Sequence, residues 1–495
     1  MGDFAGRAPL GPGSLWEIAM DRTGPPATRV AAITFLMGLA QLITTSDFSL
    51  VSVALPTIGR DLGIAPAQLS WVVSANTILF AGFLIVGGRL TDAIGHRRSL
   101  GLGLLLFAVG ALIAGLSAGV PMLIAARALQ GLAGAFVWPA SFSLINAFLP
   151  EGYARHRALG VFAVMQGLSV IIGLVLGGLL TTAIGWRAVF FLHLPIVAGC
   201  LALTAAVLPR APPSPKRRTA GGVRSTVLIA VATGLLLSAL SELGGHGLGS
   251  SLGLSLLGGA IAAWLGVAVM ESRERAPLVP LGLFAAPRLL GGGASVMALI
   301  AAFGGLFVLL SLYLQDGLRI SAAATGIRMI PIALATMAAG PCVPALMKRW
   351  PQFSVAGAGL VLEIAALLIL GVAAPAGDYL TAVAPLIFLA VFGSTTAFMA
   401  LMSLALSQVP AEDQGAASGL LFTGRQIGMS AGVAIALAVL QAFPAASPEH
   451  ALSAYGQAFL APAALAVLAL LALVTLARSP ALRAQPAGLL GGRST

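Results

Sequence analysis

Long apolar stretches recur along the whole chain, and they restrict it to a fold that crosses a membrane many times. The first stretch runs from Val30 to Ile58. The others lie at about 68–90, 99–118, 121–147, 158–184, 189–208, 225–245, 252–270, 290–314, 324–346, 354–375, 380–407, 415–443 and 456–477. Because roughly 20 apolar residues span a bilayer as an α-helix, each stretch is long enough for one crossing. The sequence therefore predicts an all-α polytopic membrane protein with fourteen transmembrane helices.

The composition excludes an ordinary soluble protein. Of the 495 residues, 58% are hydrophobic and only 9% are charged, whereas about a quarter of the residues in soluble domains are charged. Cytoplasmic loops of membrane proteins collect Lys and Arg, which explains the net charge of +11 without a nucleic-acid partner. The two cysteines lie far apart in apolar segments, and no catalytic cluster is visible. We expect no enzyme activity, no cofactor and no metal site.

The distribution of basic residues predicts the orientation of the chain. With both termini in the cytoplasm, about 20 of the 27 Lys and Arg residues fall in inner loops and tails. The outer loops then keep only Arg60, Arg187, Arg319 and Arg328. The first 28 residues contain no apolar core of the signal-peptide type. We therefore expect a multi-pass protein of the inner (plasma) membrane with both termini cytoplasmic.

One carboxylate, Asp47, lies well inside the first apolar stretch. A carboxylate at the centre of a membrane helix costs about 2.5–3.5 kcal/mol and marks a functional position. Gln41 and Thr44 add polar groups in the turns before it. We interpret this helix as facing a central pathway in which Asp47 takes up and releases protons.

The loop after the second stretch has a complete G-x-L-x-D-x-x-G spacing. It resembles the loop of the major facilitator superfamily and reads Gly88-Arg89-Leu90-Thr91-Asp92-Ala93-Ile94-Gly95-His96-Arg97-Arg98. Gly88 permits a close helix contact and Gly95 a tight turn. Asp92 either pairs with a basic residue or caps a neighbouring helix N-terminus, and with Arg97 and Arg98 it would latch the inner side. The alternative is a plain positive-inside loop.

The fourth stretch is similar to the R-x-x-q-G-x-g pattern of the same superfamily. On a helix, one face carries Arg127, Gln130, Gly131, Gly134 and Trp138. A guanidinium in an apolar segment needs a partner or water. The resemblance implies that Arg127 lies near Asp47, and a switch between paired and unpaired arrangements would move a proton. The alternative is that Arg127 only binds backbone carbonyls.

Two further features resemble the fourteen-span drug:proton antiporters within that superfamily. Asp47 followed by Val53-Ala54-Leu55-Pro56 is similar to a stretch of their first span, and a basic linker precedes two extra spans. In the fifth span, Gly173, Gly177 and Gly178 match an antiporter pattern, but Leu174 replaces its proline. The resemblance covers residues 30–477.

This resemblance implies the major facilitator fold, with two six-helix bundles and two inserted helices that alternate access around a central site. The expected order is a tail (1–29), a first bundle (30–208), a basic linker (209–224), two inserted helices (225–275), a second bundle (276–477) and a tail (478–495). The implied function is proton-driven efflux of amphipathic compounds by a monomer in the lipid bilayer.

The remaining candidates lie within the spans. Glu363 is the only carboxylate in the middle of a span of the second half, where it either binds a proton or cation or faces another helix. Asp47 and Glu363 suggest a cationic substrate, unless they serve protons alone. The candidate residues for the cavity and substrate are Gln41, Asn76, Gln130, Trp138, Gln166, Phe307 and Arg425.

Other functions compete with drug efflux. One alternative is a carrier of the same fold that moves a metabolite or a lipid by symport. The missing proline at position 174 leaves antiport and symport both open. A receptor is disfavoured because no loop is long enough for a ligand-binding domain, and a channel because no filter-like loop is present.

Overall fold

The chain folds into a bundle of long helices. A computed structural model describes residues 27–63, 66–148, 153–208, 223–247, 249–274, 283, 286–320, 322–376, 378–410, 413–443 and 448–478. Within these residues, fourteen helices are long and apolar enough to cross a membrane. In lipid, backbone groups must bond within their own segment, which is why apolar stretches of this length fold as helices. The predicted fold class and number of spans are confirmed.

The first bundle contains six spans that pack on one another. They are α2 (Ala27–Asp61), α3 (Pro66–Ile94), α4 (His96–Gly115), α5 (Val120–Phe148), α6 (Tyr153–Ala183), and the short α7 (Arg187–Phe191) with α8 (His193–Val207). The helices α3 and α4 pack on α5, and α2 packs on α6. The predicted sixth span is therefore divided into two helices, with Leu192 between them.

The second bundle repeats this arrangement. Its helices are α11 (Pro287–Leu312), α12 (Ala322–Arg328), α13 (Ile330–Arg349), α14 (Gln352–Ala373), α15 (Ala384–Leu406), α16 (Gln414–Gln441), α17 (Pro448–Ala458) and α18 (Leu460–Arg478). A π-helical turn, Tyr313–Gly317, continues α11, and another, Tyr379–Val383, precedes α15. The helix α11 packs on α16 and α18, and α14 packs on α15.

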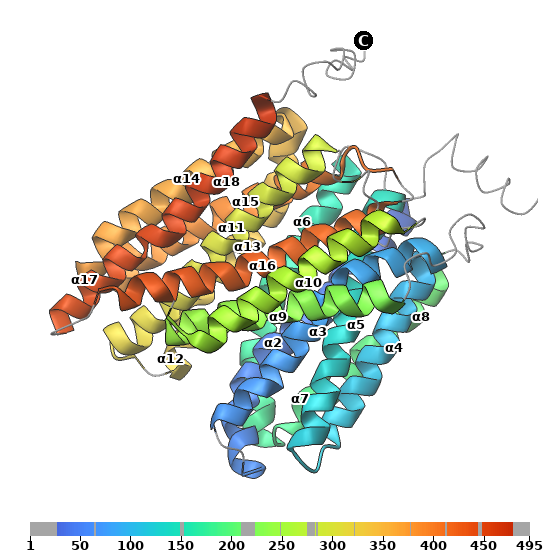
Figure 1. Ribbon diagram of the computed structural model, residues 1–495, viewed down its shortest axis with the longest axis horizontal. Helices are drawn as coiled ribbons and strands as arrows, with labels where there is room; N and C mark the ends of the chain where they lie inside the picture. The colour runs from blue at the N-terminus through green and yellow to red at the C-terminus, as the bar shows by residue number, and fades with distance from the viewer. Residues whose placement is uncertain are drawn as a thin grey trace, which may run out of the picture.

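Two inserted helices lie against the flank where the bundles meet. They are α9 (Val223–His246) and α10 (Ser251–Arg273), and they pack on each other. The helix α9 contacts both α3 and α16, and it crosses between the bundles in Figure 1. A Cβ added at Gly82 of α3 would lie 3.1 Å from Cα of Ala230, and one at Gly244 would lie 2.8 Å from Cα of Ala434. Small residues thus bring α9 close to each bundle.

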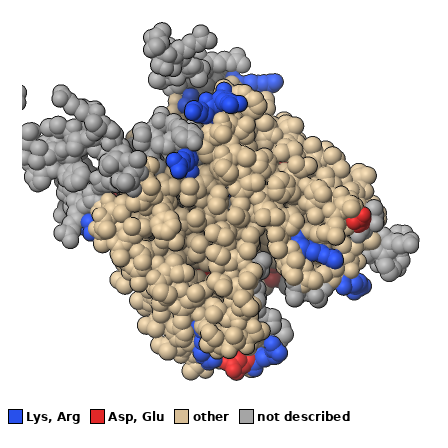
Figure 2. All heavy atoms as spheres, turned by 180° about the vertical axis from the view of Figure 1, so that it is seen from behind, with Lys and Arg blue, Asp and Glu red and all other residues tan. Residues whose placement is uncertain are grey.

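The bundles meet at one end of the molecule and diverge at the other. At the closed end, α3 ends and α16 begins, and a Cβ added at Gly88 would lie 2.1 Å from the backbone oxygen of Gly415. On the opposite flank, a Cβ at Gly160 of α6 would lie 2.2 Å from the oxygen of Gly340 of α13. The ends that carry α7 and α17 are splayed (Figure 1). Figure 2 shows a fissure between the two lobes at this splayed end.

On the face shown in Figure 2, few charged residues lie between the two ends. In Figure 2, Lys and Arg gather toward the ends, and uncharged residues cover the belt between them. This belt matches the hydrocarbon core of a bilayer. The predicted linker and tails lie mainly outside the described residues, at 209–222, 1–26 and 479–495. Their boundaries remain predictions.

Candidate functional site

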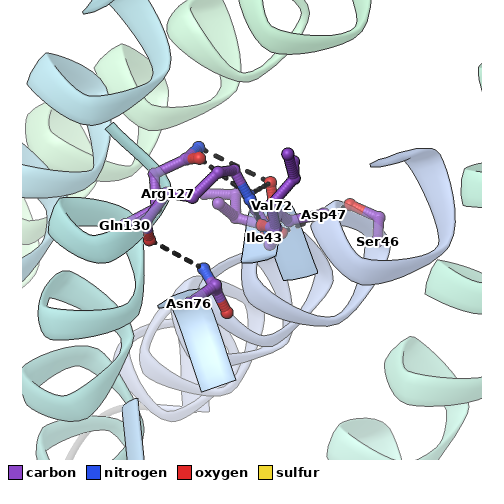
Figure 3. Close-up of polar contacts among 7 residues, drawn as sticks. All are labelled: Ile43, Ser46, Asp47, Val72, Asn76, Arg127 and Gln130. Atoms are coloured by element: carbon purple, nitrogen blue, oxygen red, sulfur yellow. Dashed lines mark hydrogen bonds and ion pairs between the residues drawn. The ribbon is translucent and has the colours of Figure 1, made fainter. Parts of the chain in front are cut away.

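A buried ion pair joins α2 to α5. Nη1 of Arg127 lies 2.9 Å from Oδ1 and 2.7 Å from Oδ2 of Asp47 (Figure 3). Arg127 is 1% exposed and Asp47 is 3% exposed. Removing two charges from water costs several kcal/mol each, and only close contacts with further hydrogen bonds offset this cost. The structure therefore brings together the two residues whose proximity the family resemblance implied.

Neighbouring polar groups complete the surroundings of this pair. Nη1 of Arg127 also donates to Oε1 of Gln130 at 2.7 Å, and Nε donates to the carbonyl of Val72 at 3.1 Å. The side-chain nitrogen of Asn76 lies 3.4 Å from the carbonyl of Arg127 (Figure 3). Arg127 contacts both an acidic partner and a backbone carbonyl, so the alternative that it binds only backbone carbonyls is wrong. Arg127 would therefore keep hydrogen-bond acceptors if Asp47 became neutral.

Glycines on α5 bring it close enough to α3 for these contacts. A Cβ added at Gly131 would lie 2.1 Å from the backbone oxygen of Asn76. One added at Gly134 would lie 2.9 Å from the ring of Phe80. Close helix approach of this kind replaces the hydrophobic driving force that is missing in lipid.

Glycines on α6 bring this helix close to α2, beside Asp47. A Cβ at Gly173 would lie 2.4 Å from Cβ of Ser49, and one at Gly177 would lie 3.2 Å from Cα of Leu50. Gly178 lies next on α6 and is partly exposed. The helix α6 runs unbroken through residue 174, as expected where leucine stands in place of a kinking proline.

Asp92 holds the two bundles together at the closed end. Its Oδ1 accepts from the backbone nitrogen of Gly415 and its Oδ2 from that of Ala416, each at 2.9 Å. A carboxylate at a helix N-terminus satisfies unpaired N–H groups and the helix dipole, a contribution of about 1–2 kcal/mol. Of the two partners considered from sequence, Asp92 contacts the helix N-terminus.

The basic residues around Asp92 have other contacts. Arg89 lies 3.7 Å from Asp413 across the bundle interface, while Arg97 donates to the carbonyl of Leu208 at 2.9 Å. Arg98 is exposed at the closed end. Gly95 joins α3 to α4 with a φ of 87°, a conformation that other residues rarely adopt. The cross-bundle ion pair thus involves Arg89, which lies outside the predicted latch of Asp92, Arg97 and Arg98.

An aromatic cluster lies between the bundles. Trp138 of α5 packs edge-on against Phe80, Phe162 and, from the other bundle, Phe422, with ring centroids 5.0–5.9 Å apart. Its indole nitrogen donates to Thr44 of α2 at 2.9 Å. The guanidinium of Arg425, on α16, lies 5.2 Å from the centroid of the Trp138 ring. Trp138 and Arg425 therefore lie at the interface of the two bundles.

Glu363 has a different location. It is 0% exposed on α14, which packs mainly on α15 and α18 of its own bundle. A Cβ at Gly393 of α15 would lie 2.8 Å from its backbone nitrogen, and Ser394 is a polar neighbour. Among the described residues, neither carboxylate oxygen makes a hydrogen bond of good geometry and no basic group forms an ion pair with it. The structure does not bring Glu363 to the Asp47–Arg127 pair.

The other predicted cavity residues are scattered. Gln41 is buried on α2 and donates to Thr45 at 2.6 Å. Gln166 is partly exposed on α6. Phe307 lies on α11, tilted against Phe303 at 6.3 Å, and it is partly buried against the core of the second bundle.

Sequence reasoning missed His193, the first residue of α8. It is 0% exposed, and its ring packs edge-on against that of Phe107, with the ring centroids 5.4 Å apart. The sequence feature that indicates His193 is its position in an otherwise apolar segment. Across the described residues, no group of three His, Cys, Asp or Glu is placed to hold a metal ion.

Comparison with known proteins gives a consistent result. Residues 37–433 match the family model of the Major Facilitator Superfamily. The cephamycin export protein of Amycolatopsis lactamdurans is 34% identical over 477 residues, which cover 95% of this chain and 96% of that protein. The puromycin resistance protein of Streptomyces alboniger is 33% identical over 422 residues, covering 83% and 82%.

A solved structure shares the fold. The crystal structure of the human organic anion transporter MFSD10 superposes with a TM-score of 0.64 at 18% identity, and the match covers 89% of this chain and 100% of that one. At this identity the likeness concerns the fold alone. Together with the fourteen spans, the family match describes a multi-pass membrane protein with a transporter fold.

Proposed function

Because this chain belongs to the Major Facilitator Superfamily, we propose that it exports amphipathic small molecules in exchange for protons by alternating access. Relatives that match most of the chain are named for export of, or resistance to, antibiotics. The transported compound would be a small amphipathic molecule, and protons would be the coupling ion. The protein would function as a monomer in the lipid bilayer of the plasma membrane.

The observation that carries this proposal is the buried Asp47–Arg127 pair. A proton bound by Asp47 would cancel its charge and weaken its attraction to Arg127. Arg127 would keep its contacts with Gln130 and the carbonyl of Val72, so breaking the pair does not leave the guanidinium without acceptors. Proton binding would thereby loosen α2 from α5 at low cost, and loss of the proton would restore the contact.

The arrangement of the bundles supports alternating access. We assign the closed end to the cytoplasm, together with both termini, because the positive-inside rule places most basic residues there. In this assignment the structure is open to the outside. Opening toward the cytoplasm requires Asp92 to leave Gly415 and Ala416, and Trp138 to separate from Phe422. Asp92 would act as the latch and the aromatic cluster as the barrier behind it.

A same-fold carrier that moves a metabolite or a lipid with protons, by symport, is the second candidate. The observation that favours it is Leu174, which stands where the antiporter pattern has proline and leaves α6 as an unbroken helix. The direction of proton movement distinguishes the two candidates.

The test uses purified protein in proteoliposomes with an imposed pH gradient and a panel of amphipathic fluorescent compounds. Antiport predicts that substrate moves against the direction of the protons and that Asp47→Asn abolishes this coupled movement. The matched control is Asp61→Asn, which removes an exposed acid at the end of the same helix. Substrate moving with the protons would establish symport. Coupled transport by a well-folded Asp47→Asn protein would contradict the role of Asp47.

A further inference from the structure

The charges in the interior of the spans do not cancel. Asp47 and Arg127 neutralise each other. At the closed end, Asp92 accepts hydrogen bonds from the N-terminus of α16. Glu363 is enclosed within its own bundle. Arg425 then remains as a cation between the bundles, and in the described chain no carboxylate forms an ion pair with it.

The position of Arg425 is close to the middle of the membrane. It lies eleven residues after the first residue of α16, which corresponds to roughly 16 Å along the helix, about half the thickness of the hydrocarbon core. Its guanidinium faces Trp138 of the opposite bundle. The residue is partly exposed, and its Nε is buried without a hydrogen-bond partner among the described residues.

The surroundings of Arg425 stabilise it only in part. A guanidinium stays charged at physiological pH and offers five donors in a rigid fork. The Trp138 ring attracts a cation, but it accepts no hydrogen bond in the plane of the fork and carries no net charge. Donors of Arg425 therefore remain available for an acceptor that carries negative charge.

We propose that Arg425 binds the anionic group of the transported compound, so that the substrates are amphipathic organic acids. This inference rests on the proposed function and specifies its substrate class. A carboxylate or sulfonate would accept from the guanidinium, and the apolar body would lie against Trp138 and the two rings that pack on it, Phe80 and Phe162. The sequence suggested a cationic substrate because of Asp47 and Glu363, but neither carboxylate is placed to receive one. Asp47 is paired with Arg127, and Glu363 lies away from the interface between the bundles.

Three probes with the same apolar body separate these possibilities. They are anthracene carboxylate, its neutral carboxamide and the aminomethyl cation, and their binding to the purified full-length protein is measured near neutral pH. We expect the carboxylate to bind wild type at least about tenfold more tightly than either of the others. Arg425→Gln should weaken carboxylate binding by about ten- to a hundredfold and leave carboxamide binding almost unchanged. Arg425→Lys should retain part of the preference, because it keeps the charge but loses the fork.

The control variant is Arg60→Gln, which removes an exposed basic residue from the splayed end of α2 and should leave the three affinities unchanged. Unaltered thermal unfolding of Arg425→Gln shows that the variant is folded. The inference is overturned if the carboxamide or the cation binds wild type as tightly as the carboxylate. It is also overturned if folded Arg425→Gln keeps the affinity for the carboxylate. Proton-coupled transport of the cation alone would overturn this inference and leave the proposed function standing, whereas binding of none of the probes counts against both.

Discussion

Asp47 and Glu363 are both carboxylates buried in apolar helices, yet their surroundings differ. Asp47 has a guanidinium at 2.7 Å and lies on a helix that contacts α5 and α6 beside the bundle interface. Glu363 lies between α14 and α15 with Ser394 as a polar neighbour. When a fixed charge lies next to an acid, protonation of the acid weakens the contact between the helices, whereas protonation of an acid without such a neighbour breaks no ion pair. Depth in the membrane alone therefore does not distinguish the two acids, whereas the neighbouring charge does.

The largest effect is expected from breaking the Asp47–Arg127 pair on one side. Arg127→Gln leaves the buried Asp47 carboxylate without its cation and should reduce the free energy of unfolding by about 3–5 kcal/mol. Asp47→Asn leaves Arg127 its contacts with Gln130 and the carbonyl of Val72, so it should reduce the free energy of unfolding by less. The double variant Asp47→Asn/Arg127→Gln removes both charges and should recover most of this stability without recovering proton-coupled transport. Thermal unfolding in detergent and vesicle transport measure the two properties. Additive losses of stability in the double variant would show that the residues do not act as a pair.

A smaller effect is expected at Glu363. Glu363→Gln keeps the shape of the side chain and removes only the capacity to ionise, so we expect a change in unfolding free energy of about 1 kcal/mol or less. The transport rate and the number of protons exchanged should stay near those of wild type. The measurement is proton uptake per substrate in proteoliposomes. Loss of coupling in a variant of normal stability would make Glu363 a second coupling site and remove the contrast with Asp47.

The smallest effect is expected at Asp61, an exposed acid that serves as a reference for the two buried ones. Hydrogen bonds from Trp186 and Arg187 lower the pKa of Asp61 below its ordinary value of 3.8. An acid with a lowered pKa contributes its stability fully above the ordinary value, and this contribution is lost as the pH falls through the folded-state pKa. Wild type and Asp61→Asn should therefore differ slightly, and constantly, in melting temperature from neutral pH down to mildly acidic pH. The difference should vanish only below 3.8; a difference that changes near neutral pH would contradict this assignment.

Much of the fold follows from the sequence, because apolar length determines the spans and each span must be helical in lipid. The proximity of Asp47 and Arg127 was implied by family resemblance, and the structure brings them into contact. The partner of Asp92 was left open, since Gly415 lies 323 positions away and belongs to the other bundle. Local spacing carries no information about such a contact.

The location of Glu363 shows a second limit of prediction from the sequence. In a soluble helix, the polar face indicates which side is exposed, but both lipid and protein interior are apolar around a membrane helix. Nothing in the residues around Glu363 therefore distinguishes a face toward α15 from a face toward the pathway. The same applies to Arg425, whose contact with Trp138 depends on how the two bundles meet.

The inserted helix α9 has a consequence for any movement of the bundles. It contacts α3 near Ala230 and α16 near Gly244, so it belongs to neither half alone. A rotation that separates α3 from α16 must break one of these contacts or slide along it. Both contacts consist of glycine and alanine, whose small side chains do little to prevent the helices from sliding past each other. In the proposed cycle, the two extra helices would move as a third body, and the two halves would not rock independently of it.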